Sequence, residues 1–384
     1  MESVPPGPPA AVIPPSGAWR PGDHPGNRRF ARLGWLRTER GSILDVTMAY
    51  ETWGSLNAAQ DNAVLVLHAL TGDSHVTGGA GPGHPTPGWW SGLIGPGAVL
   101  DPADWFIVAP NVLGGCQGTT GPASLGQDNR PFGSRFPALT VRDQVAAEVW
   151  LADRLGVDRW GLVLGGSMGG MRVLEWAVTA PARVARIAAI ATGARSTADQ
   201  IAWAHLQLAA IKADPGFQGG DYYSSAPGQG PHVGLGLARQ IAHTTYRSAG
   251  ELQDRFGAGR QPGEDPLAGG RFAVQGYLDH HAAKLARRFD ANSYLRLTES
   301  MLTHDVGRGR GGVAAALRRV RADALVVAID SDRLFPPHLS HELARHLPRS
   351  RSGLVRSAHG HDGFLLESPQ IGRLLGAFLD SGKP

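Results

Sequence analysis

The chain carries a serine between glycines, in the pentapeptide Gly165-Gly-Ser-Met-Gly169. A Gly-x-Ser-x-Gly sequence is typical of a sharp turn from a strand into a helix, which exposes the serine hydroxyl as a nucleophile. Chance alone can produce this pattern in a chain with 53 glycines, and a serine that only caps a helix is the alternative. The context favours a nucleophilic Ser167, because an apolar run at 160–164 leads into the turn and a helical pattern at 168–180 leaves it.

A nucleophilic serine needs a base that takes its proton and an acid that orients the base. After the serine, Asp330 and Asp332 follow an apolar run at 324–329, and His359 and His361 follow a shorter one around 354–355. The order Ser, Asp, His is the one in which these groups occur after a Gly-x-Ser-x-Gly turn. Spacing alone does not choose between the two aspartates or between the two histidines.

The oxyanion formed during acyl transfer requires two backbone N–H donors. One donor is expected from Met168, the residue after the serine, and the other from the loop that follows an earlier strand. The loop 68–73 comes directly after the apolar run 63–67, and we predict that Leu70 supplies the second donor; an ordinary turn is the alternative.

The histidines do not form a recognisable metal-binding pattern. Neither a His-x-x-x-His helix pair nor a set of cysteine or carboxylate ligands accompanies His68, His75, His359 and His361. We therefore expect no metal.

Short apolar runs alternate with helical patterns along much of the chain, at 46–52, 63–67, 105–110, 160–164, 187–191 and 324–329. Continuous apolar runs of this length indicate strands buried on both faces, hence a mostly parallel sheet and the α/β class. A capping box at Thr140–Asp143 predicts a helix that ends near Gly156, and Pro181 is expected to end the helix after Ser167.

The alternation stops between residues 197 and 297, where helical periods at 201–211, 235–246 and 272–289 occur without a strand-like run. We interpret 197–297 as a helical insertion over the sheet, called the lid below, between two parts of one core at 28–196 and 298–384. Residues 1–27 contain eight prolines and few apolar anchors, so a mobile extension is expected there.

Composition excludes several classes of protein. The 384 residues carry a net charge of +4, and the 34 arginines and 3 lysines are scattered, so a nucleic-acid-binding surface is not expected. Apolar runs are too short to cross a bilayer, which predicts a soluble protein and no membrane partner. With Cys116 as the single cysteine and no signal-peptide pattern, a reducing cytoplasm is the expected compartment.

From about Arg28 to the C-terminus the chain closely resembles the homoserine O-acetyltransferases, acyltransferases of the α/β-hydrolase superfamily. The segments that carry the resemblance are His68-Ala-Leu-Thr-Gly-Asp73, Pro87-Gly-Trp-Trp90, Ile94-Gly-Pro-Gly97, Asn111-Val-Leu-Gly-Gly-Cys-Gln-Gly-Thr-Thr-Gly-Pro122, Gly133-Ser-Arg-Phe-Pro137, Gly165-Gly-Ser-Met-Gly-Gly170, Ser331-Asp-Arg-Leu-Phe-Pro336 and Gly360-His-Asp-Gly-Phe-Leu365. The resemblance implies an α/β-hydrolase fold with an inserted helical lid.

The resemblance also assigns roles to particular residues. It implies that Asp332 is the acid and His361 the base of the triad. In the segment 238–246 it implies that Arg239 binds the substrate carboxylate, with Tyr246 near it, and that Asp362 receives the substrate ammonium. A bidentate arginine and an aspartate suit a zwitterion such as homoserine. Without the resemblance, Arg239 would be interpreted as a charged residue on the surface of a helix.

The implied reaction is a ping-pong transfer of acetyl from acetyl-CoA through Ser167 to L-homoserine, a step toward methionine. Acetyl-CoA is a substrate, so no cofactor is implied, and the family suggests a homodimer that contacts through the lids. Succinyl-CoA as donor and serine as acceptor remain alternatives within the family. A serine esterase with the same triad and a binding protein without activity are the alternatives outside it, and no nucleophilic role is expected for Cys116.

Overall fold

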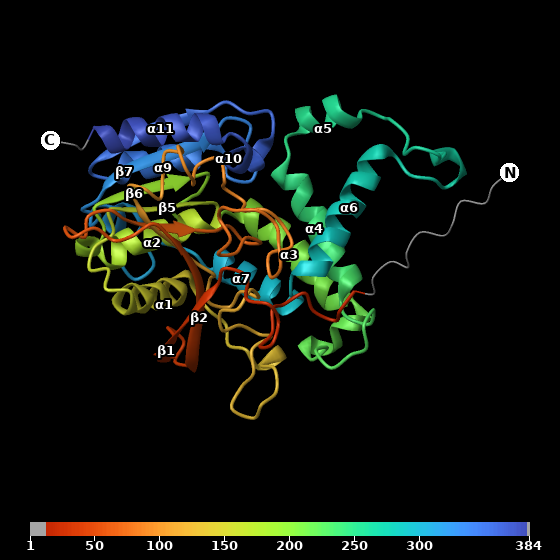
Figure 1. Ribbon diagram of the computed structural model, residues 1–384. Coiled ribbons are helices and arrows are strands. Elements are labelled where there is room, and N and C mark those ends of the chain that lie inside the picture. The colour runs from red at the N-terminus through yellow and green to blue at the C-terminus, as the bar shows by residue number, and fades with distance from the viewer. Residues whose placement is uncertain (1–12, 382–384) are drawn as a thin grey trace.

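The computed structural model describes residues 13–381, which form one eight-stranded sheet with helices on both faces (Figure 1). The strands in spatial order are β1 (Arg29–Arg37), β2 (Ile43–Trp53), β4 (Phe106–Pro110), β3 (Ala63–Leu67), β5 (Leu162–Gly166), β6 (Arg186–Ile190), β7 (Asp323–Ile329) and β8 (Ser350–Val355). β1 pairs antiparallel with β2 and β2 with β4, and all later neighbours are parallel. The predicted α/β class with a mostly parallel sheet is confirmed.

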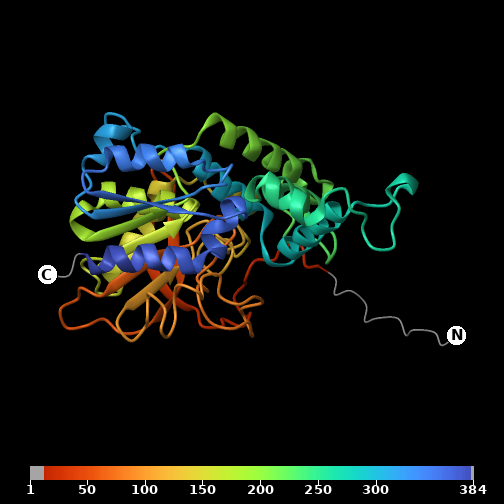
Figure 2. The same cartoon turned by 90° about the horizontal axis from the view of Figure 1, so that it is seen from above.

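The central strands are apolar at consecutive positions because helices cover both faces of the sheet. Alternate residues of β5, such as Val163 and Leu164, enter two different apolar clusters. One cluster contains side chains of α1 (Val141–Arg154), α2 (Met168–Thr179), α8 (Val313–Leu317) and α9 (Pro337–His346). The other contains side chains of α10 (Gly363–Leu366) and α11 (Ser368–Asp380), which lie on the opposite face (Figure 2).

Six predicted strands occur where the apolar runs are, with shifted ends. β5 begins and ends two residues later than the predicted strand 160–164, because Gly165 and Gly166 continue the backbone ladder with β6 although they have no side chains to reveal it. β1 was not predicted, since its exposed outer positions break the apolar run.

The two predicted helices of the core are confirmed. α1 begins after Thr140, whose side chain accepts from the backbone N–H of Asp143 while Asp143 bonds back to the backbone N–H of Thr140. α2 starts at Met168, directly after the serine, and ends just before Pro181.

Between β6 and β7 the described chain forms helices rather than strands of the sheet. The first five α-helices of this stretch are α3 (Ala198–Ala213), α4 (His232–Tyr246), α5 (Ala249–Phe256), α6 (Ala273–Arg288) and α7 (Ala291–Leu302), and α8 follows them before β7. These helices lie to one side of the sheet, and the chain from α5 to the start of α6 projects farthest from the core (Figures 1 and 2).

The expected mobile extension at residues 1–27 is wrong for residues 13–27, which pack against the rest of the molecule; residues 1–12 lie outside the described residues. The backbone N–H of Gly17 donates to the carbonyl of Phe289, and that of Trp19 donates to the carbonyl of Cys116. The Ser16 hydroxyl donates to the buried Asp290 carboxylate at 2.7 Å. These contacts are made mainly by backbone groups, which the proline content of the sequence does not reveal.

None of the helices within residues 13–381 is both long and apolar enough to cross a bilayer.

Candidate active site

Ser167 lies at the carboxyl end of β5, in the sharp turn that the pentapeptide predicted. Its backbone has φ 57° and ψ −124°, which costs roughly 1–3 kcal/mol and persists only where the surroundings enforce it. Its N–H donates to the carbonyl of Ile190, and its own carbonyl accepts from the Thr192 hydroxyl, both at 3.0 Å. These two bonds fix the turn against the neighbouring strand β6.

The glycines around the serine are required by close packing. A Cβ at Gly165 would lie 2.7 Å from the carbonyl oxygen of Leu67, and one at Gly166 would lie 2.4 Å from the Phe364 ring. A side chain at either position would push the turn away from β3 or from the segment that carries His361.

His361 and Asp332 form the pair that spacing alone left undecided. His361 lies in the short 3₁₀ helix η5 (Gly360–Asp362) after β8, and Asp332 follows β7. Nδ1 of His361 is 2.6 Å from Oδ2 of Asp332, and both residues are at most 3% exposed. The other carboxylate oxygen accepts from the backbone N–H groups of Leu334 and Phe335, both at 2.8 Å.

This geometry determines which nitrogen of His361 is free. Since a carboxylate only accepts, Nδ1 must donate to Asp332, and in the neutral ring Nε2 is the acceptor. Nε2 is buried and has no hydrogen-bond partner among residues 13–381. The imidazole ring stacks on Phe335 with centroids 5.2 Å apart, which restricts its orientation further.

Asp330 and His359 occupy different surroundings from the buried pair. Asp330 is exposed and accepts from the backbone N–H of Ser357 at 2.9 Å. His359 has a side chain that is 39% exposed, and its Nδ1 lies 3.3 Å from the Glu251 carboxylate.

Ser167 and His361 belong to the same end of the sheet. Gly166 packs against Phe364, and the Phe364 ring lies 5.2 Å from the imidazole of His361. The order β5, β6, β7, β8 brings the three carboxyl ends that carry Ser167, Asp332 and His361 to one edge.

Met168 and Leu70 are both buried and share one apolar cluster beside the turn. Because α2 begins at Met168, the N–H of this residue is one of the terminal donors that a helix leaves without an internal partner. Leu70 lies in the loop after β3, where the N–H of Gly72 closes a turn onto the carbonyl of Ala69 at 2.9 Å. The structure therefore positions a helix terminus and this loop next to each other.

The three residues that the family resemblance assigned to substrate lie around His361. The Tyr246 ring on α4 is 5.9 Å from the His361 ring, and the Arg239 guanidinium on the same helix is 5.4 Å from the Tyr246 ring. Oδ2 of Asp362 lies 3.1 Å from Nε of Arg247. Burial raises the pKa of the Asp362 carboxyl, and the nearby cations of Arg247 and Arg239 oppose this rise.

Three arginines of this region were missed at the sequence level. Arg247 pairs with Asp362, Arg288 donates from Nη2 to the carbonyl of Thr71 at 2.6 Å, and Arg172 donates from Nη2 to the carbonyl of His68 at 2.5 Å. The available signal was an arginine within α2, a helix in which Glu175 is the only other charged residue, since charged side chains are rarely buried without a partner.

A cavity of about 50 Å³ adjoins this site and is mostly apolar. Its lining residues are Leu70, Met171, Ser196, Gln200, Trp203, Ala204, Gln207, Thr245, Tyr246, Thr298, Met301, Leu302, Leu334 and Phe335. No lysine or arginine is among these described residues.

One group of possible metal ligands occurs within the described residues, formed by Glu51, His75 and His84, whose ligand atoms all lie within 4.8 Å of one another. The two imidazole rings are stacked, with centroids 3.8 Å apart and planes 11° apart. Because each nitrogen lone pair lies in its ring plane, two nearly parallel stacked rings do not both point at one ion. Nε2 of His84 already accepts from the backbone N–H of Asn27 at 2.9 Å, so we interpret the cluster as polar packing.

Comparison with known proteins identifies a matching family and similar proteins. The sequence matches the family described as the alpha/beta hydrolase fold over residues 62–368. A homoserine O-acetyltransferase of Thermobifida fusca is 60% identical over 366 residues, which cover 94% of this chain and 96% of that protein.

Two solved structures are also similar. The crystal structure of a homoserine O-acetyltransferase from Bacillus anthracis has a TM-score of 0.84 at 25% identity, covering 92% of this chain and 97% of that one. The crystal structure of esterase E22 has a TM-score of 0.83 at 25% identity, covering 92% of this chain and 99% of that one.

Proposed function

The chain belongs to the homoserine O-acetyltransferase family within the α/β hydrolase fold, and from this premise we propose that it is an acyltransferase that moves an acetyl group from acetyl-CoA to the hydroxyl of L-homoserine. The observation that carries the proposal is the buried pair of Asp332 and His361, with the free Nε2 of His361 at the end of the sheet that presents Ser167. This arrangement is what nucleophilic acyl transfer requires.

In the first half of the reaction, Nε2 of His361 takes the proton of Ser167 while Oγ attacks the thioester carbonyl carbon. The N–H groups of Met168 and Leu70 stabilise the resulting oxyanion, and loss of one such donor typically costs about 10²–10³ in rate. The C–S bond then breaks, His361 returns the proton to the leaving CoA thiolate, and an acetyl ester remains on Ser167.

In the second half, the hydroxyl of homoserine attacks the acetyl ester while His361 takes its proton. The attack forms a second tetrahedral intermediate, which collapses to O-acetylhomoserine and restores the serine hydroxyl with the proton from His361. Asp332 holds the imidazole in the tautomer that both halves need, because its carboxylate accepts from Nδ1 throughout.

The acceptor is proposed to lie between α4 and η5. Arg239 would bind the carboxylate of homoserine, and the Tyr246 ring lies close to both Arg239 and His361. Asp362 would bind the ammonium group as a second partner beside Arg247, because its carboxylate has room for more than one donor. An amino acid held at both ends has its hydroxyl directed toward the acylated serine, and water is a poorer competitor.

The cavity beside Leu70 and Phe335 supports acetyl rather than succinyl as the acyl group. Its lining includes no cation within the described part of the chain, so a succinyl carboxylate would be buried there without a partner. An unpaired buried charge costs about 3 kcal/mol or more, which is on the order of 10² in kcat/KM. The same cavity accepts a methyl group without such a penalty.

The test compares products and acyl-enzyme. Mixing the protein with acetyl-CoA alone should add the mass of one acetyl group, and Ser167→Ala should abolish this addition, whereas the exposed-serine control Ser91→Ala should retain it. Adding homoserine should then release O-acetylhomoserine. Succinyl-CoA in place of acetyl-CoA should give little acyl-enzyme, and equal acylation by both donors would contradict the assignment of the cavity.

The likeness to esterase E22 favours hydrolysis as the second candidate function. In that case acetate would accumulate at the same rate with or without homoserine. Arg239→Met discriminates further, because a transferase should keep its acylation rate and lose apparent affinity for homoserine. Arg255 on α5 has a half-exposed side chain, and Arg255→Met is the matched control. This variant should change neither the acylation rate nor the apparent affinity for homoserine.

Several finer features belong to the same proposal. We place the reaction in the methionine pathway and in the cytoplasm, with no cofactor, since acetyl-CoA itself supplies the acyl group. We also propose a homodimer that contacts through the lid at 197–297, where α3 and α4 expose large apolar side chains, namely Ile201, Leu206, Val233 and Leu237. Light scattering should give twice the monomer mass, and Val233→Asp should lower it to that of a monomer.

A further inference from the structure

An ion pair buried behind the active site joins α1 to α2. Nη1 of Arg172 lies 2.6 Å from Oε1 of Glu148, and the other carboxylate oxygen accepts from the indole N–H of Trp176 at 2.7 Å. Both members of the pair are completely or almost completely excluded from solvent. The cost of removing two charges from water offsets most of their attraction, so such a pair contributes little net stability. The presence of this pair therefore needs another explanation.

The second arm of the Arg172 guanidinium reaches the loop after β3. Nη2 donates to the carbonyl oxygen of His68 at 2.5 Å, and His68 is the first residue of the loop that contains Leu70. The imidazole of His68 is itself fixed, because its Nε2 accepts from the backbone N–H of Val112 at 3.0 Å. Arg172 therefore binds a loop whose first residue is already held on its other side.

Arg172 also belongs to the helix that begins with the other oxyanion donor. Met168 lies four positions before it, one turn of α2, and Gly169 leaves no side chain between this turn and the carbonyl oxygens of Leu67 and His68. One rigid, planar guanidinium thus spans from the first turns of α2 to the loop of Leu70.

We propose that Arg172, held in place by Glu148, is a positioning residue that sets the spacing between the N–H donors of Met168 and Leu70. The inference rests on the proposed acyl transfer through Ser167. The donors come from two separate elements, so their spacing depends on whatever ties those elements together. Displacement of about 1 Å in such a site typically lowers the rate on the order of 10²-fold, whereas binding of the acceptor by the lid is not affected.

The test separates positioning from stability with the double variant Glu148→Gln/Arg172→Met. Arg172→Met alone leaves the Glu148 carboxylate buried without a cation to balance its charge and should lower the thermal midpoint strongly. In the double variant the buried charge is gone, and the amide oxygen of the introduced glutamine still accepts from Trp176, so the midpoint should return toward that of the unmodified protein. We expect kcat to stay lowered on the order of 10²-fold, with little change in KM for homoserine.

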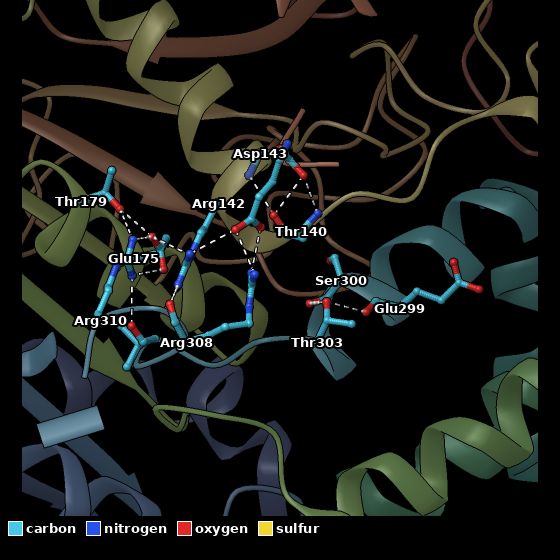
Figure 3. Close-up of polar contacts among 12 residues, drawn as sticks. Thr140, Arg142, Asp143, Glu175, Thr179, Glu299, Ser300, Thr303, Arg308 and Arg310 are labelled. Atoms are coloured by element: carbon cyan, nitrogen blue, oxygen red, sulfur yellow. Dashed lines mark hydrogen bonds and ion pairs between the residues drawn. The ribbon is translucent and has the colours of Figure 1, made fainter. Parts of the chain in front are cut away.

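A matched control lies one turn further along α2. Glu175 is equally buried and pairs with Arg310, which also donates to Thr179, and none of these contacts involves the loop after β3 (Figure 3). Glu175→Gln/Arg310→Met should therefore change the thermal midpoint and leave kcat unchanged.

The outcomes are distinct. Recovery of kcat together with the midpoint in the double variant, or an equal loss of kcat in the Glu175 control, overturns the positioning role. If the double variant does not fold, Arg172→Lys replaces it, because a lysine keeps the charge opposite Glu148 but lacks the second nitrogen; unchanged kcat in that variant also overturns the role. Failure of the unmodified protein to acetylate Ser167 would instead refute the proposed function.

Discussion

Replacing Gly169 by alanine should separate the two proposed oxyanion donors, Met168 and Leu70, without changing the side chains of Ser167, Asp332 or His361. Gly169 lies in the first turn of α2, where an added Cβ would be 2.0 Å from the carbonyl oxygen of Leu67 and 3.1 Å from that of His68. Real Cβ atoms do not approach other heavy atoms closer than 3.0 Å, so the helix and the strand end must move apart by about 1 Å. The atoms in conflict are backbone atoms, which no rotamer change can move away.

The size of the effect follows from what this movement displaces. Met168 precedes the substituted position, and the loop of Leu70 begins at the carbonyl that is pushed away, so the two N–H donors are forced apart. A displacement of about 1 Å lowers the rate on the order of 10²-fold, which corresponds to about 3 kcal/mol in the activation free energy. Overpacking should also lower the free energy of unfolding by about 1–3 kcal/mol.

The assay measures kcat for transfer to homoserine together with urea unfolding. Gly376→Ala in α11 is the control, because its Cβ would meet only Val99 Cγ2 at 3.7 Å and alanine favours a helix by about 0.5–1 kcal/mol over glycine. We expect this control to be slightly stabilised and fully active. A folded Gly169→Ala protein with kcat within about threefold of the unmodified protein would refute the reasoning from the oxyanion geometry.

Three further predictions concern single side chains. Asp332→Asn should lower kcat on the order of 10⁴-fold, with acylation by acetyl-CoA followed by stopped flow, because the amide no longer selects the productive tautomer of His361. Burial raises the pKa of the Cys116 thiol to about 12, so a disulfide reagent at pH 8 should modify this residue only after unfolding, and rapid modification of the native protein would contradict its burial. Burial lowers the pKa of His304 to about 4 from 6.5, so the folded state binds its proton later than the unfolded chain as pH falls. About 3 kcal/mol of stability that is present above pH 6.5 should therefore be lost as pH falls toward 4, and urea unfolding of His304→Asn should show a flatter profile in this window.

The sequence predicted the sheet well because strands covered on both faces are apolar at successive positions, as β3 is throughout and β7 is from Ala324 to Ile329. The sequence left two candidates for the acid, Asp330 and Asp332, and two for the base, His359 and His361. Spacing does not choose between them, because the direction in which a loop side chain points depends on tertiary contacts. In the structure the backbone N–H groups of Leu334 and Phe335 fix Asp332, whereas Asp330 is directed to solvent. Local spacing does not encode this difference.

Residues 13–27 illustrate a second limit. Their proline content predicted a segment that buries too little surface to offset the entropy lost when it becomes ordered. In the structure Pro15, Ser16 and Ala18 are buried, and the Trp19 ring packs against Phe30 with centroids 4.9 Å apart. The segment is also held through its backbone, because Gly17 is so close to α6 and its end that a Cβ at this position would lie 2.5 Å from the nitrogen of Phe289. Such a contact depends on a single glycine, and the composition of a proline-rich segment does not reveal it.

The lid and the oxyanion loop are connected by contacts that likewise leave no sequence pattern. Arg288, at the end of α6, donates to the carbonyl of Thr71, which lies 217 positions away, and Arg239 on α4 lies 3.4 Å from the Thr71 hydroxyl. Thr71 follows Leu70, so a movement of α4 and α6 displaces the proposed carboxylate-binding group and the proposed oxyanion donor together. Arg172 holds the same loop from the core. The proposed stabilisation of the oxyanion therefore depends on one loop that is held from two sides, by the core through Arg172 and by the lid through Arg288.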